Sequence, residues 1–194
     1  MGSDTGKLRL WAGPITDMRY LGGKTKIGKS IARYLTDLRQ PGQTYYEPFV
    51  GACGVFKHMD DPKVGSDSCK DLILMYQALQ NGWIPPVSVP KEMYRTLSKF
   101  PPSAMRAFAG FGCSFSGNWF SGYATSEGRN FAFEARNSLL RMLPSIIDAE
   151  FIHQDYRDSV FLPNSLIYCD PPYPYNIGYS SSGELDLSVF WGTM

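Results

Sequence analysis

The chain has 194 residues, of which 43% are apolar and 19% are charged, and its net charge is +1. These values are typical of one globular domain and argue against wholesale disorder or two full domains. Its apolar runs are too short to span a membrane, and no signal peptide is indicated. With four cysteines but no C-x-x-C pair, and two histidines, we expect reduced thiols in a cytoplasmic compartment and no metal.

The charges are distributed unevenly along the chain. Residues 1–40 and 91–141 carry net charges of +5 and +4, whereas residues 41–90 and 142–194 carry −2 and −6. Such blocks favour an anionic partner beside an acidic site, although scattered surface lysines and arginines would give the same counts.

Strand and helix patterns alternate along the chain. After an irregular lead-in over residues 1–17, a helix is predicted whose buried face comprises Ile27, Ile31, Tyr34, Leu35 and Leu38. The later patterns predict strands at 45–49, 63–67, 150–153 and 165–169, the start of a helix at 55–59, and helices at 72–79 and 130–143. This alternation predicts an α/β fold with a largely parallel sheet.

Residues 83–130 differ in composition from their surroundings, because proline, glycine and aromatic residues are concentrated there. This composition predicts an insertion with little regular structure after a short helix, and the least regular part is expected at 110–123. The remaining segments, 18–82 and 131–194, are expected to form the main domain, to which the resemblance described below assigns the catalytic role.

The first candidate motif is a phosphate-binding loop. Gly23–Ser30 matches G-x-x-x-x-G-K-[ST] and opens a predicted helix, whose backbone amides could hold phosphates. The strand that ends at Asp170 could supply a magnesium-holding acid, so a nucleotidase is an alternative function. Two observations argue against this function. A phosphate-binding loop requires a buried strand before its first glycine, but the residues before Gly23 are few and polar. The two prolines that follow Asp170 also have no role in magnesium binding.

A second motif joins a strand to a loop of small residues. Tyr46–Gly54 leads from a predicted strand into Gly-Ala-Cys-Gly, and Asp67 ends the next strand. Small residues let a ligand approach the backbone, and an acid at this spacing can bind the ribose hydroxyls of an adenosine cofactor. A tight turn and a surface carboxylate would be the simpler interpretation.

The third motif is the most specific. Asp170-Pro171-Pro172-Tyr173 follows an apolar strand, at the end where open α/β sheets bind ligands. Methyl transfer to an exocyclic amine needs two acceptors for its N–H groups, and the Asp170 carboxylate and Pro171 carbonyl can serve. The Pro-Pro pair fixes that carbonyl, and Tyr173 offers a face for stacking a base removed from the duplex.

Together these motifs resemble the Dam-type DNA adenine-N6 methyltransferases, which include many phage enzymes. Residues 19–24 resemble the family's N-terminal cofactor motif, 47–52 its cofactor loop, and 170–173 its catalytic motif, in the family's order. The resemblance extends over residues 18–191 and implies a Rossmann-like S-adenosylmethionine-dependent methyltransferase sheet. It also places the target-recognition region at 83–130, and it explains Gly23–Ser30 without ATP.

The resemblance implies a role for each matching residue. Asp170, Pro171, Pro172 and Tyr173 would be catalytic. The residues implied to contact S-adenosylmethionine are Tyr20, Gly23, Lys24, Glu47, Phe49, Gly51, Asp67, Asp155, Tyr156 and Asp170. Within these, Tyr20 would flank the cofactor, Asp67 would bind its ribose, and Asp155 or Tyr156 would lie near its adenine.

Double-stranded DNA would be the partner, in a bacterial or phage-infected cell. The residues expected to contact DNA are Arg95, Lys99, Arg106, Trp119 and Arg129. The chain departs from the family pattern at Cys53, where glycine is usual, and at Met194, where family members continue through further strands. We therefore expect a sheet incomplete at its C-terminal side, with self-association or a complementing fragment. A catalytically inactive DNA-binding remnant is the main alternative.

Overall fold

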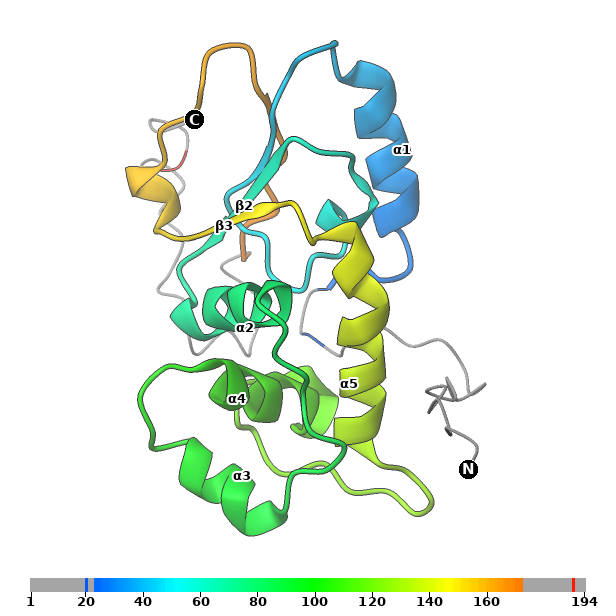
Figure 1. The fold of residues 1–194 in the computed structure, drawn as a ribbon, viewed down its shortest axis with the longest axis vertical. Coiled ribbons are helices and arrows are strands. Elements are labelled where there is room, and N and C mark those ends of the chain that lie inside the picture. The colour runs from blue at the N-terminus through cyan, green and yellow to red at the C-terminus, as the bar shows by residue number, and fades with distance from the viewer. Residues whose placement is uncertain (1–19, 21–22, 173–189, 191–194) are drawn as a thin grey trace, which may run out of the picture.

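The computed structural model describes Tyr20, residues 23–172 and Phe190, and every structural statement below concerns these residues (Figure 1). The lead-in at 1–17 and the catalytic-motif residue Tyr173 lie outside them. The strands are β1 (Tyr45–Glu47), β2 (Lys63–Asp67), β3 (Glu150–His153) and β4 (Leu166–Ile167). The α-helices are α1 (Gly28–Leu38), α2 (Lys70–Gln80), α3 (Lys91–Leu97), α4 (Ala104–Ala107) and α5 (Phe131–Met142).

The four strands form one parallel sheet in the order β3-β2-β1-β4. This arrangement confirms the predicted α/β fold. The chain adds β2 and then β3 on one side of β1, and then places β4 on the other side. The strand order therefore reverses between β1 and β4, which is where open α/β sheets commonly form a binding crevice.

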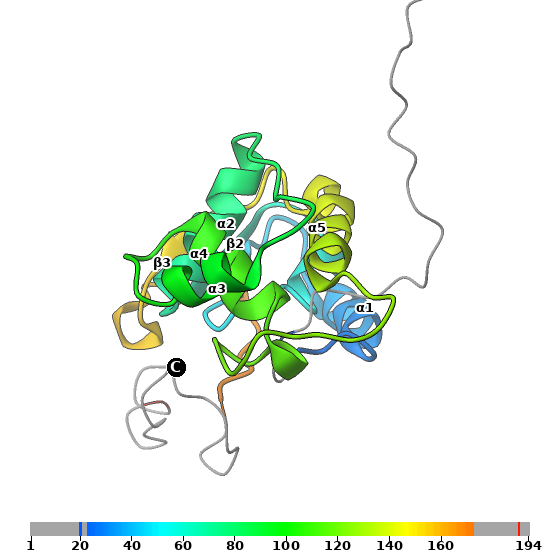
Figure 2. The same ribbon diagram turned by 90° about the horizontal axis from the view of Figure 1, so that it is seen from below.

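Helix α2 covers β2 and β3 through its predicted apolar face. Leu72, Met75, Tyr76 and Leu79 are all buried, and the Tyr76 ring lies 4.8 Å from that of Phe151 on β3. Helix α4 packs on α2, and α3 lies farther from the sheet (Figures 1 and 2). The main core therefore lies between the sheet and the insertion that follows α2.

Helix α1 forms where the sequence predicts it but presents a different face to the core. Its buried residues are Gly28, Ala32 and Leu35. Of the expected buried face only Leu35 is buried, whereas Ile27, Tyr34 and Leu38 are exposed by 51%, 65% and 48%. The small residues face inward because α1 packs closely on the backbone of Gly54.

The insertion is more ordered than its composition predicts. Helix α4 continues into a π-helical turn, Phe108–Gly112, whose five residues are all buried. An isolated antiparallel bridge then joins Ser114 to Tyr123. Aromatic burial thus makes much of this segment part of the main core, although the sequence indicated a loop.

Candidate functional site

The carboxyl ends of the strands bring the sequence-predicted acids to one edge of the sheet. Glu47 and Asp67 are the last residues of β1 and β2, and Asp170 follows β4 by three residues. The reversal of strand order between β1 and β4 lies at this edge. The candidate site therefore comprises this edge and the loop at 48–54 after β1.

Backbone and side-chain hydrogen bonds hold the loop after β1. The Val50 amide donates to the Ser66 carbonyl at 2.9 Å, and the Tyr76 hydroxyl donates to the Gly51 carbonyl at 2.6 Å. Gly51 has a φ of +45°, a left-handed conformation that glycine adopts readily. Cys53 has a φ of +58° and is fully buried, so this loop holds a side chain where glycine would be less strained.

Asp67 ties the end of β2 to this loop. Its Oδ2 accepts from the Gly51 amide at 3.0 Å, and its Oδ1 accepts from the Cys69 amide at 2.8 Å. Burial raises the pKa of Asp67, while these two amide bonds oppose the rise. The sequence indicated a ribose ligand but not this structural tie, although an Asp two residues before Cys69 is a recognisable Asx-turn signal.

The N-terminal motif lies directly on the loop. A Cβ at Gly51 would lie 3.3 Å from Cε1 of Tyr20, so that ring covers the Gly51 backbone. The Tyr20 ring also lies 5.0 Å from the ring of Phe111 in the insertion. The Lys24 backbone approaches Gly54, where an added Cβ would lie 2.9 Å from the Lys24 nitrogen. The first two resemblance blocks are thus in contact.

Lys24 also joins the N-terminal motif to the catalytic motif. Its Nζ lies 2.5 Å from Oδ2 of Asp170, and the two side chains are 27% and 21% exposed. Pro171 and Pro172 are half-buried beside this pair. The structure therefore brings Lys24 and Asp170 together at the β1–β4 junction, while Gly23 lies exposed at the turn that begins from Tyr20.

Glu47 lies buried at the same junction. The Tyr45 hydroxyl, two residues earlier on the same face of β1, donates to Oε1 of Glu47 at 2.5 Å. Burial raises the pKa of Glu47 to about 8, the hydrogen bond from Tyr45 opposes this shift, and the charge of Asp170 adds to it. The sequence singled out Glu47 but missed Tyr45, for which the i, i+2 spacing on a strand was the available signal.

An aromatic cluster closes the side of the edge nearer β3. The rings of Phe49 and Tyr156 lie 5.1 Å apart, and Phe190 lies 6.1 Å from the first and 5.7 Å from the second. Asp155 instead turns to Arg157, whose guanidinium makes two bonds to it and lowers its pKa. The rings of Phe49 and Tyr156 are thus in contact, whereas Asp155 is engaged in a local ion pair.

The Gly23–Ser30 segment has the geometry of a packed helix start. The amides of Ile27 and Gly28 both donate to the Lys24 carbonyl, at 3.1 and 2.6 Å. A Cβ at Gly28 would lie only 2.0 Å from the Gly54 carbonyl oxygen. Because the loop after β1 covers this helix start, the geometry does not support a phosphate cradle there.

Two residues expected to meet DNA have packing roles instead. Arg106 Nη1 lies 2.8 Å from Oδ2 of Asp71, with side-chain exposures of 17% and 7%. The Arg106 guanidinium also lies over the Trp119 ring at 5.0 Å, and that ring contacts Phe111 at 4.6 Å. Arg106 and Trp119 therefore anchor the insertion on α2, and we remove them from the expected DNA surface.

The other three lie at the surface. Arg95 pairs with Glu92 on α3, and Lys99 is exposed just after that helix. Arg129 makes two bonds to Glu134 and lies over the Phe131 ring at 4.6 Å. These cations lie on the insertion and its junction with α5, where the resemblance places target recognition.

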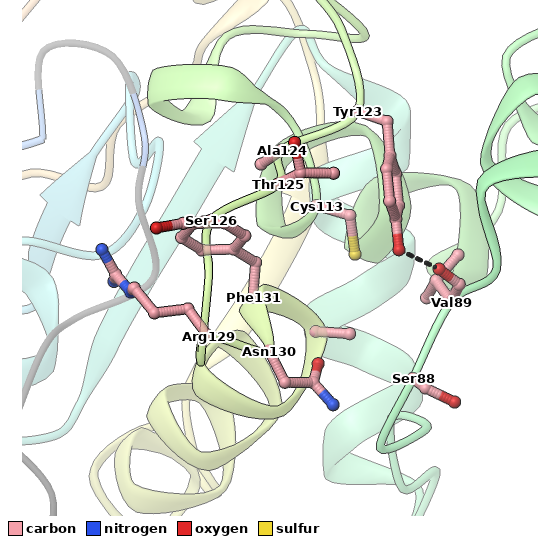
Figure 3. Close-up of a pocket in the computed structure, with 11 residues that line it drawn as sticks. Ser88, Val89, Cys113, Tyr123, Ala124, Thr125, Ser126, Arg129, Asn130 and Phe131 are labelled. Atoms are coloured by element: carbon pink, nitrogen blue, oxygen red, sulfur yellow. Dashed lines mark hydrogen bonds between the residues drawn. The ribbon is translucent and has the colours of Figure 1, made fainter.

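A pocket of about 310 Å³ lies between the insertion and the start of α5 (Figure 3). Its larger polar side chains already have partners: Tyr123 donates to the Val89 carbonyl, and Asn130 bonds both the Phe133 amide and the Val87 carbonyl. None of its lining residues belongs to the candidate site. The pocket therefore has no evident link to the chemistry at the strand ends.

Two further features bear on the class of site. Among the described residues, no group of three histidines, cysteines or acids is placed to hold a metal ion. The helices in that part of the chain include none with the length and apolar character needed to cross a membrane.

Comparison with known proteins identifies one family. The family of D12 class N6 adenine-specific DNA methyltransferases matches residues 20–101. This range includes Tyr20, Lys24, the loop after β1 and Asp67, whereas Asp155 and Asp170 lie outside it. No curated protein matches the chain. Over residues 20–101, which hold two of the three motif blocks, the resemblance drawn from the sequence is therefore confirmed: this part of the chain matches the D12 class of N6 adenine-specific DNA methyltransferases.

Proposed function

We propose that the protein is an S-adenosylmethionine-dependent methyltransferase that acts on adenine N6 in DNA. The observation that carries the proposal is the Lys24–Asp170 ion pair. It joins the N-terminal motif, which lies in the family match, to the catalytic motif beyond it. Both motifs meet at the reversal of strand order, where this class of sheet binds ligands.

The residues around the loop fit the cofactor. At Gly51 and Gly54 the loop has no side chain of its own over the backbone, and the ring of Tyr20 lies beside Gly51. Each Asp67 oxygen accepts one amide bond, which leaves lone pairs for two ribose hydroxyls. Phe49 and Tyr156 would provide an apolar wall for an adenine. S-adenosylmethionine supplies a methyl group already activated on a positively charged sulfur.

Asp170 and Pro171 would hold the target amine. The Asp170 carboxylate and the Pro171 carbonyl can accept its two N–H groups, which directs the nitrogen lone pair toward the methyl group. Lys24 can hold the Asp170 carboxyl in place for this contact, because its ammonium lies 2.5 Å from Oδ2. Tyr173, outside the described residues, is proposed to stack on the adenine after base flipping.

Cofactor binding and methyl transfer test the proposal separately. Calorimetry should detect S-adenosylmethionine and should detect no magnesium-dependent ATP binding. Transfer of labelled methyl to adenine in DNA should fall by at least about 10²-fold in Asp170→Asn, because the amide carries no negative charge and presents an N–H donor in place of one carboxylate oxygen. The matched control is Asp148→Asn, since Asp148 is an exposed acid between α5 and β3.

Each alternative function has its own signature. Binding of cofactor and DNA with no transfer by the unsubstituted protein would indicate the inactive DNA-binding remnant. Tight ATP binding that is lost in Lys29→Ala would indicate the nucleotidase and would overturn the proposal.

A further inference from the structure

Two residues of β1 form a buried polar pair at the centre of the site. Tyr45 is fully buried and Glu47 is 4% exposed, so neither gains much from bulk water. The 2.5 Å contact from the Tyr45 hydroxyl to Glu47 Oε1 fixes that carboxyl on the β1 face it shares with Tyr45. A buried carboxyl held in one position at a ligand edge suggests a role beyond packing, because burial of an ionisable group is unfavourable.

The charged and titratable groups near Glu47 come from every neighbouring element. They are Tyr45 on β1, Lys63 on β2, Cys53 in the loop, and Cys169 and Asp170 after β4. Two cations belong to this surrounding: the Nζ of Lys63 donates to the carbonyls of Met59 and Ser145, and the Nζ of Lys24 lies 2.5 Å from Asp170 Oδ2. Lys24 is thus engaged by Asp170 and Lys63 by two backbone carbonyls, so a further positive charge beside an ionised Glu47 would be favourable.

We propose that Tyr45 is a positioning residue whose hydroxyl holds the buried Glu47 carboxyl so that, once ionised, it balances the positive charge of the sulfonium cofactor. This inference rests on the proposed function. When the cationic cofactor binds, the Glu47 carboxylic acid loses one proton to solvent, and no other bond changes. The product S-adenosylhomocysteine has a neutral sulfur, so its affinity should depend less on the ionisation of Glu47.

The direction in which the affinity ratio changes with pH follows from whether Glu47 of the unliganded protein carries a proton. Burial raises the pKa of free Glu47 to about 8, so below that pH binding of the cation must release a proton. The affinity ratio of S-adenosylmethionine to S-adenosylhomocysteine should therefore rise with pH, by at most about tenfold per pH unit, and level off near pH 8. Because both ligands carry the same α-amino group, the effect of its titration largely cancels in the ratio.

Tyr45→Phe tests the pair with little change of volume. It removes a hydrogen bond that favours the ionised carboxyl, so the levelling pH should move upward by about one unit. Glu47→Gln should make the ratio independent of pH. The matched control is Tyr46→Phe, because Tyr46 is half-buried and points to the opposite face of the same strand. Its profile should equal that of the unsubstituted protein.

The experiment measures both dissociation constants by calorimetry across this pH range, and the infrared carboxylic-acid band of the unliganded protein. The band lost in Glu47→Gln should titrate near pH 8, and at a higher pH in Tyr45→Phe. A flat affinity ratio when both ligands bind, or an unchanged profile in Tyr45→Phe, would overturn the inference alone. Failure of both ligands to bind would overturn the proposed function and, with it, the cofactor role of Glu47. The infrared titration would then still test the Tyr45–Glu47 pair.

Discussion

The contact between α1 and the loop after β1 leads to a sharp prediction for Gly28→Ala. Gly28 is the first residue of α1, and where the backbone suits both residues alanine is more favourable than glycine by about 0.4–1 kcal/mol, because it restricts the unfolded chain. Here, however, the new Cβ would lie 2.0 Å from the Gly54 carbonyl oxygen. That distance is more than 1 Å shorter than an ordinary carbon–oxygen contact of roughly 3.3 Å, and the clashing atom belongs to the backbone.

Relief of this clash requires α1 or the loop to move. Overpacking costs about 1–3 kcal/mol, and an overlap with backbone lies at the upper end of that range. After the gain from the restricted unfolded chain is subtracted, the free energy of unfolding should fall by about 2 kcal/mol. Cofactor affinity should fall as well, because the Lys24 backbone packs on Gly54.

Urea unfolding measures the stability change, and calorimetry with S-adenosylmethionine measures the affinity. The control is Ser30→Ala, an exposed site on the same helix, where stability should rise by about 0.5 kcal/mol from propensity alone. A rise of about 0.4–1 kcal/mol in Gly28→Ala would mean that α1 does not touch the loop. The start of the helix would then be open, and the phosphate-loop interpretation would return.

The remaining predictions concern the loop, the insertion and the buried acid. Cys53→Gly should be more stable than Cys53→Ala by about 1 kcal/mol in urea unfolding, reversing the usual order, because the φ is +58°. Arg106→Met should lose about 2–3 kcal/mol, because its buried carboxylate partner is left unpaired, while the salt dependence of DNA binding stays unchanged. Replacing Arg95 and Lys99 together by alanine should lower the log affinity–log salt slope by about 2 with stability nearly constant; an unchanged slope would place the DNA surface elsewhere. The folded-state pKa of Glu47 exceeds its ordinary value, so its stabilising contribution should be lost as pH rises toward 8, and a Glu47→Gln stability profile should lack that decline.

Local sequence determined the elements whose signals are complete within a few residues. The predicted strands at 63–67 and 150–153 are β2 and β3 residue for residue. Asn130 caps α5 through its bond to the Phe133 amide, as its position before the apolar pattern indicates. The order of the motifs likewise placed the small-residue loop, Asp67 and Asp170 at strand ends, because parallel strands share a carboxyl edge.

The tertiary structure decided which of several plausible faces and partners each residue uses. On α1, Gly28 and Ala32 are buried beside Leu35, whereas most of the large apolar residues are exposed. The small residues face inward because the helix approaches the backbone of Gly54 closely. Arg106 could have met a phosphate, but folding places Asp71 and Trp119 against it. Arg106 and Asp71 lie far apart in the chain, so a pattern read over a few residues does not contain their contact. Helix periodicity fixes spacing, whereas close approach and charge pairing depend on what the rest of the fold presents.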